Sequence, residues 1–206
     1  MPHQHHTISL GFTGQTFPAG VHVCQIFSND EERLSSLLEF LRSGLVAGER
    51  TACFSDNLDE HDLAKYLNRH GLSSDALKAS GALSCSGARA VYFQDGRFDP
   101  ERTLGMLRQY HEDSVAHNYP AARVIGEMSS EVQNMPGGSR LLEYESRVSL
   151  LLKDHPVTAV CQYDANAFDG AMLMKILKVH PMMVIRGVVV RNPYYIAPSE
   201  FLAREC

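Results

Sequence analysis

The stretch "GVHVCQIFSNDEERLSSLLEFL", residues 20–41, predicts a buried strand, a short turn and an amphipathic helix. The segment "VHVCQIF" is an apolar run between a glycine and a polar turn, which is typical of a buried strand. Downstream, leucines recur at helical spacing and predict a stripe that faces a core. These leucines are Leu34, Leu37, Leu38, Leu41 and Leu45. We expect Asp30 to cap this helix and Arg33 to lie on its outer face.

Strand and helix patterns alternate five times along the chain, and the central strands are apolar throughout. Continuous apolar strands are typical of a parallel sheet that helices cover on both faces. The segment "MMVIRGVVVRNPYY", residues 182–195, predicts instead two strands that meet near Arg186-Gly187. The expected fold class is therefore α/β, with a mostly parallel central sheet and an antiparallel edge hairpin at the C-terminus.

Composition narrows the classes of protein to which the chain can belong. Its 206 residues are 44% hydrophobic and 21% charged, as in ordinary globular proteins. The formal net charge of -5 disfavours direct nucleic-acid binding. No apolar run approaches the roughly 20 residues that span a bilayer, and the N-terminus does not resemble a secretory signal. We expect a cytoplasmic protein that contacts no membrane.

The polar residues 1–19 predict a flexible N-terminal arm, and residues 20–206 predict a single folded domain. The chain has five cysteines, all widely spaced and without a C-x-x-C pair. This spacing argues against a disulfide framework and against a zinc knuckle. We therefore expect reduced thiols.

The ends of the predicted strands are the expected ligand site. In parallel α/β sheets, ligands bind beyond the carboxyl ends of the strands. We expect a largely apolar pocket there with few polar groups. The residues that finish the strands are Phe27, Asn29, Glu127, Met128, Gln162, Tyr163 and Asp164. His22 and Cys24 lie deeper in the first strand, and we expect them to form the floor of this pocket or the core below it.

The turn after the first strand, Ser28-Asn29-Asp30, lacks the features of a phosphate loop. Such a loop needs glycines, whose backbone N–H groups point inward, and a lysine that reaches the outer phosphates. This turn has neither, and acidic residues follow it directly. We expect no ATP hydrolysis, and the sequence assigns no cofactor.

His22 and Cys24 are two residues apart on the first strand and therefore share one face of the sheet. They could supply metal or haem ligands, with Cys161 as a third ligand, or form a reactive thiol beside a base. The alternative is a packed histidine beside a buried cysteine that acts as a small apolar residue. Cys161 and Tyr163 also share a face, whereas at most one of Glu143 and Glu145 can point inward from its helix.

Seven pieces of the sequence occur together in a recognisable order: "GVHVCQIF", "DGRFDPERTL", "VIGEMSS", "LLEYESRV", "VCQYD", "KVHPMMVI" and "NPYY". Together they resemble the MEDS family, the sensory domain named for methanogens, methylotrophs and the dichloromethane dehalogenase repressor. The resemblance runs from about Gly20 to Phe201. It implies a RecA/KaiC-like core that lacks a phosphate loop. Glu127 then lies about where a related ATPase would hold its magnesium carboxylate.

The resemblance also implies a function in signal transduction, including transcription regulation. Relatives sense small molecules, hydrocarbon derivatives among them, and are joined to DNA-binding, histidine-kinase or anti-sigma kinase modules. We expect a stand-alone sensory domain that regulates a separate partner, such as a histidine kinase or an anti-sigma factor. A homodimer formed through an edge strand or a helix face is a further arrangement that stays open.

Three alternatives stay open beside this reading. The first is a metal- or haem-binding redox sensor that uses His22 and Cys24. The second is a degenerate nucleotide-binding protein, and the third is a cysteine-dependent enzyme. We favour a binding module over an enzyme, because no nucleophile turn such as G-x-S-x-G is present.

Overall fold

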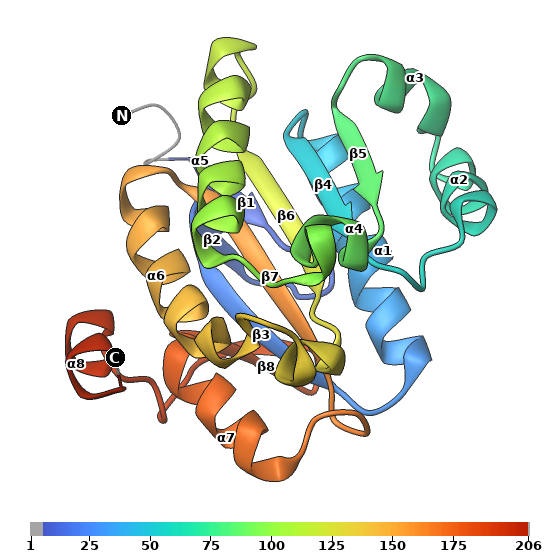
Figure 1. Ribbon diagram of the computed structural model, residues 1–206. Coiled ribbons are helices and arrows are strands. Elements are labelled where there is room, and N and C mark those ends of the chain that lie inside the picture. Colours follow the sequence, from blue (N-terminus) through green and yellow to red (C-terminus); the bar gives the residue numbers. More distant parts are fainter. Residues whose placement is uncertain (1–5, 206) are drawn as a thin grey trace.

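The computed structural model describes residues 6–205, and its centre is a seven-stranded sheet with the order β5-β4-β6-β7-β3-β8-β9 (Figure 1). Its strands are β3 (His22–Phe27), β4 (Arg50–Phe54), β5 (Leu83–Ser86), β6 (Ala122–Glu127), β7 (Val157–Asp164), β8 (Met182–Ile185) and β9 (Val188–Arg191). All neighbours pair in parallel except β8 and β9, which are antiparallel. The predicted α/β fold class is confirmed, including the C-terminal edge hairpin.

Eight α-helices occur in the described residues: α1 (Asp30–Val46), α2 (Glu60–Arg69), α3 (Ser74–Ala79), α4 (Ala88–Tyr92), α5 (Pro100–Ala116), α6 (Leu141–Asp154), α7 (Gly170–Val179) and α8 (Pro198–Glu205). Three short 3₁₀ segments lie in the connections: η1 (Gln94–Gly96), η2 (Ser130–Asn134) and η3 (Gly138–Arg140). The β8–β9 hairpin turns at Arg186-Gly187, with φ angles of 51° and 74°. Positive φ angles at both central residues are typical of hairpin turns whose twist matches that of the flanking strands. The turn lies where the sequence predicts it.

Each face of the sheet carries its own apolar core. Alternate residues of a strand point to opposite faces, so neighbours such as Val23 and Cys24 enter different cores. One core packs under α5, α6 and α7, which lie on the near side of the sheet in Figure 1. The other packs against α1 and α2 on the opposite side. The near core is the one that contains the buried side chains discussed below.

Part of the N-terminal segment differs from the flexible arm expected over residues 1–19. Strands β1 (Thr7–Ser9) and β2 (Thr16–Pro18) form an antiparallel pair, whereas residues 1–5 of the predicted arm lie outside the described residues. The pair is anchored because Ile8 and Leu10 are fully buried in the core beneath α1. Arg123 also donates a 2.9 Å hydrogen bond to the carbonyl oxygen of Ser9.

The start of α1 also differs in two details from the sequence prediction. The N-cap is Asn29 rather than Asp30, since the Asn29 side chain accepts a hydrogen bond from the Glu32 backbone N–H. Arg33 is buried rather than outward-facing, with 1% of its surface exposed. Its guanidinium pairs with Asp30 at 2.7 Å and reaches the carbonyl oxygen of Asn57, so its charge is compensated inside the fold.

Candidate functional site

The carboxyl ends of β3, β4, β6 and β7 border a depression that we call the strand-end cleft. It consists of two adjoining hollows of about 240 and 150 Å³, which share Asn57, Glu127 and Asp164. Polar side chains supply much of its lining. The expectation of a largely apolar pocket is therefore wrong for this cleft, because polar loop residues follow the strands at this edge. These loop residues include Asp56, Asn57, Ser129 and Ser130.

Glu127 is held in the cleft by three side-chain partners. Its Oε2 accepts a 2.8 Å hydrogen bond from the Ser55 hydroxyl and lies 3.5 Å from Arg33 Nη1. Its Oε1 accepts a 2.9 Å bond from Asn57 Nδ2. These partners come from α1 and from the segment after β4. Tertiary contacts therefore fix the Glu127 carboxylate, which still lines the cleft.

Five of the seven predicted strand-end residues line the cleft: Phe27, Asn29, Glu127, Met128 and Asp164. Gln162 and Tyr163 do not. The Gln162 amide donates to Gln25 and to the carbonyl oxygen of Arg33, beneath α1. Tyr163 points to the opposite face of the sheet, as alternation along β7 requires.

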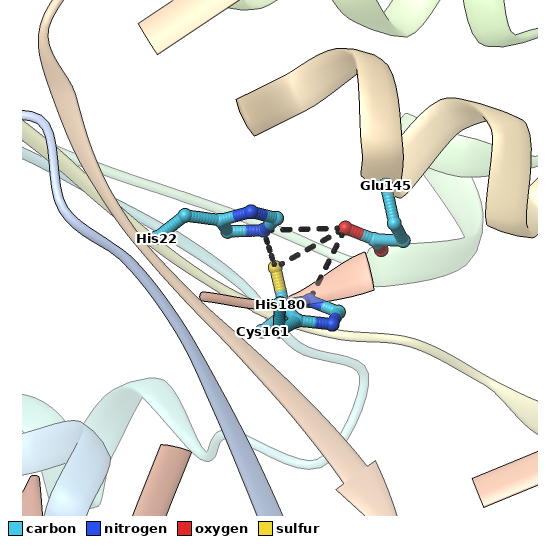
Figure 2. Close-up of side chains that lie close together, drawn as sticks. All are labelled: His22, Glu145, Cys161 and His180. Carbon is cyan, nitrogen blue, oxygen red and sulfur yellow. Dashed lines mark hydrogen bonds and ion pairs between the residues drawn. The ribbon is translucent and has the colours of Figure 1, made fainter. Parts of the chain in front are cut away.

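On that opposite face, four side chains form what we call the buried quartet: His22, Glu145, Cys161 and His180 (Figure 2). One ligand-type atom from each lies within 4.8 Å of the others. Glu145 Oε2 is 3.3 Å from His22 Nε2 and 3.4 Å from His180 Nε2. Cys161 Sγ is 3.4 Å from His22 Nε2 and 3.7 Å from Glu145 Oε2. Three of the four residues are fully buried, and Cys161 is half-buried.

The quartet is assembled from four separate elements. His22 begins β3 and Cys161 lies on the adjacent strand β7, so both project from one sheet face. Glu145 reaches down from α6, and His180 directly follows α7. Glu145 and Ser149 are four residues apart on α6 and share one helix face, so the same helix contacts both ring nitrogens of His22.

Hydrogen bonds outside the quartet fix its orientation. Tyr163 donates a 2.6 Å bond to Glu145 Oε1. His180 Nδ1 lies 2.8 Å from the carbonyl oxygen of Ile176, and His22 Nδ1 lies 2.8 Å from the Ser149 hydroxyl. The atoms that remain free to converge are therefore Oε2 of Glu145, both Nε2 atoms and the Cys161 sulfur.

Burial and neighbouring groups shift the pKa values of three quartet residues. Burial and the neighbouring His180 lower the pKa of His22 to about 4, although Glu145 opposes the shift, so His22 is neutral near pH 7. Burial alone would raise the pKa of Glu145, but the two facing imidazoles hold it well below its usual range. Burial, together with Glu145, raises the pKa of the Cys161 thiol well above its ordinary value.

The sequence-predicted metal set of His22, Cys24 and Cys161 is only partly assembled. His22 and Cys161 meet, whereas Cys24 belongs to the apolar core and is not in the quartet. Glu145 and His180 were not predicted as ligands. Each of the four quartet residues lies in a different family-like piece of the sequence, which is the signal that could have identified them.

A hollow of about 350 Å³ opens beside the quartet at the amino end of the sheet. Its lining includes His22 and Ser149 together with Gly20, Pro181 and Tyr195. His22 therefore lies next to a surface depression, through which small solutes could approach the quartet.

The geometry gives little support to thiolate catalysis. A nucleophilic cysteine needs a lowered pKa, but burial raises the pKa of both Cys24 and Cys161.

The four cysteines that the structure describes are free thiols, as the sequence predicts. Among the described residues, no helix combines the length and the hydrophobicity needed to cross a bilayer.

Comparisons with known proteins agree with this architecture. The family described as "MEDS: MEthanogen/methylotroph, DcmR Sensory domain" matches residues 21–181. No curated protein matches the chain in sequence.

Two solved structures share the fold. The flagellar accessory protein FlaH from Methanocaldococcus jannaschii is similar with a TM-score of 0.61 and 14% identity, over 93% of this chain and 89% of that one. A KaiC-like protein from Pyrococcus horikoshii OT3 has a TM-score of 0.58 and 14% identity, over 87% and 79% of the two chains. The chain therefore has the RecA-like core found in KaiC and FlaH.

Proposed function

Because this chain belongs to the MEDS family of sensory domains, we propose that it senses a small polar molecule in the strand-end cleft and passes the signal to a separate protein. The observation that carries the proposal is the fixed carboxylate of Glu127, which Ser55 and Asn57 hold at the carboxyl end of the sheet. In parallel α/β folds this edge is where ligands bind.

The lining of the cleft defines the chemistry of the ligand. Glu127 and Asp164 are acceptors, and Ser129 and Ser130 can both donate and accept hydrogen bonds. A hydrocarbon derivative with a hydroxyl or amino group would place that donor on Glu127. Its short carbon chain would then contact the Met128 and Ala167 side of the cleft.

The size of the cleft favours a small ligand. Each of its two hollows, of about 240 and 150 Å³, falls below the range of about 300–1,000 Å³ typical of sites for drug-sized ligands, and the two together reach only its lower end. Short-chain alcohols and amines fit this volume, whereas a nucleoside triphosphate is larger, and the Arg89 guanidinium in the larger hollow is already paired with Glu131.

The experiment is a calorimetric titration of the purified protein with a panel of short-chain alcohols and amines. Native mass spectrometry of the protein as isolated would identify a co-purified compound to add to the panel. We expect at least one compound to bind, and Glu127→Gln to weaken binding about tenfold or more, as loss of a charged hydrogen-bond partner does.

Glu31→Gln is the matched control, since Glu31 is an exposed acid of α1 that does not line the cleft. It should bind the same compound with unchanged affinity. Equal binding by the Glu127→Gln variant would place the sensing site elsewhere.

For the output, we propose contact with a separate regulator such as a histidine kinase or an anti-sigma factor, with no direct binding to nucleic acid. The exposed edge strand β9 supports a contact of this kind, because Val188 and its hairpin neighbour Ile185 are about half exposed. The same edge could pair two copies of the chain, which light scattering would detect as a doubled mass. A pull-down that recovers only nucleic acid would contradict the proposed output.

A further inference from the structure

We propose that the buried quartet of His22, Glu145, Cys161 and His180 is a binding site for one divalent transition-metal ion of the zinc type. The site shares no residue with the lining of the strand-end cleft, and the proposal does not depend on ligand sensing in that cleft.

The distances within the quartet fit a single tetrahedral centre. With zinc bonds of about 2.0–2.3 Å to nitrogen, oxygen and sulfur, the ligand atoms of a tetrahedron lie about 3.3–3.7 Å apart. Four of the six ligand-atom separations in the quartet are 3.3, 3.4, 3.4 and 3.7 Å, and the other two are no longer than 4.8 Å. Side chains from four parts of the fold thus lie close to the spacing that one bound ion would impose.

The hydrogen bonds of His180 leave its Nε2 ready to bind a cation. The carbonyl oxygen of Ile176 can only accept, so His180 Nδ1 carries a proton, and a metal ion that displaces any proton from Nε2 would meet the lone pair there. This Nε2 is buried and has no hydrogen-bond partner among the described residues. It faces Glu145 Oε2 at 3.4 Å, and a cation between the two atoms would satisfy both.

His22 is oriented in the same way. Its Nδ1 contacts the Ser149 hydroxyl, which lies 3.5 Å from the carbonyl oxygen of Val179. A hydroxyl that donates to this carbonyl accepts from Nδ1–H, which leaves the His22 Nε2 lone pair directed at the quartet. Both imidazoles therefore have the arrangement of metal ligands, with the second nitrogen donating to an oxygen outside the site.

Charge balance also favours a divalent ion. With the Cys161 thiol deprotonated by the metal, one thiolate and one carboxylate would neutralise two positive charges, so the buried site would carry no net charge. Tyr163 holds the second oxygen of Glu145, which would keep this ligand monodentate. Nitrogen, sulfur and a single carboxylate oxygen in a tetrahedral set are typical of zinc.

The same geometry disfavours haem, which the sequence left open. Four donor atoms within 4.8 Å of one another enclose room for an ion and leave none for a macrocycle. An ion could enter through the hollow beside His22 and Ser149.

The test is a titration of chelator-treated protein with Co²⁺, which takes the same ligands as zinc and absorbs visible light. We expect saturation at one equivalent, intense visible bands of a tetrahedral ion, and a near-ultraviolet thiolate-to-cobalt band. Zn²⁺ should then displace the colour stoichiometrically, because zinc exceeds cobalt in affinity for such sites. Surface histidines cannot mimic this result, since they provide no thiolate.

Variants identify the ligands. Cys161→Ser should abolish the thiolate band, and His180→Gln should weaken Co²⁺ binding at least about tenfold. Cys24→Ser is the matched control. Cys24 lies opposite Cys161 in the register of β3 and β7 but outside the quartet, so this variant should keep the band. Far-ultraviolet circular dichroism of each metal-free variant checks that it is folded.

The wild-type titration needs no variant, so the proposal can fail even if a variant does not fold. Absence of the thiolate band in folded wild-type protein with excess Co²⁺ would overturn the site. Its persistence in folded Cys161→Ser would overturn it equally.

Discussion

The Tyr163 hydroxyl donates a 2.6 Å hydrogen bond to Glu145 Oε1, which leaves Oε2 of the same carboxylate facing His22 and His180. Tyr163 is adjacent in β7 to Asp164, which lines the strand-end cleft. One strand therefore contacts both candidate sites, with successive residues on opposite faces of the sheet.

Tyr163→Phe should lower the free energy of unfolding by about 1–3 kcal/mol, because a buried carboxylate oxygen loses its hydrogen-bond donor. Urea unfolding measures the change. Tyr110→Phe is the matched control, since the Tyr110 hydroxyl is buried without a hydrogen-bond partner in the described part of the chain. A Tyr163 variant as stable as the Tyr110 variant would show that the bond contributes little.

Arg123→Met should lower the free energy of unfolding by about 3–5 kcal/mol, because it leaves the buried Glu49 carboxylate without its arginine partner. It also removes the 2.9 Å bond to Ser9 and the 3.1 Å bond to the carbonyl oxygen of Phe40. Arg89→Met, which breaks an exposed pair with Glu131, should cost about 0–1 kcal/mol. Guanidinium denaturation compares the two, and similar losses for both would contradict the importance of the buried pair.

Zn²⁺ at 100 times its dissociation constant should stabilise the wild-type protein by about 2.7 kcal/mol, if it binds only the folded state. For a chain of this size, that corresponds to a rise in melting temperature of roughly 5–10 °C. At the same Zn²⁺ concentration, a tenfold weaker His180→Gln variant should keep no more than about half of this rise, whereas Cys24→Ser should keep all of it. An equal rise in all three proteins would point to nonspecific surface binding instead.

Magnesium-dependent ATP hydrolysis should be undetectable in a phosphate-release assay. The turn from β3 into α1 has no glycine or lysine, and the Asn29 side chain caps the helix. The nearby Arg33 guanidinium is engaged with Asp30 and Glu127, so it is not free to hold phosphate. Turnover that requires magnesium and disappears in Glu127→Gln would contradict this expectation.

Local patterns predicted most of the sheet and its helices. Apolar runs bounded by turns marked the strands, and the leucine spacing from Leu34 to Leu45 marked α1. The β1–β2 pair was missed because its strands have three residues each, too short for a periodic signal to stand out. The prediction that Arg33 faces outward was wrong because helix periodicity alone places a charged residue on the exposed face. The partners that allow its burial, Ser55 and Asn57, come from a distant segment of the sequence.

At the candidate sites, the sequence by itself determined which residues share a strand face, because side chains alternate with a fixed period of two. It therefore placed His22 with Cys24, Cys161 with Tyr163, and Glu127 at a strand end. Only the tertiary structure decided that Cys161 Sγ contacts His22 Nε2, although the two residues are 139 positions apart. The same holds for the contacts of Glu145, from α6, with His22 and with His180 at the end of α7. That convergence depends on strand order and on how each helix packs against the sheet, which are long-range properties that no local spacing encodes.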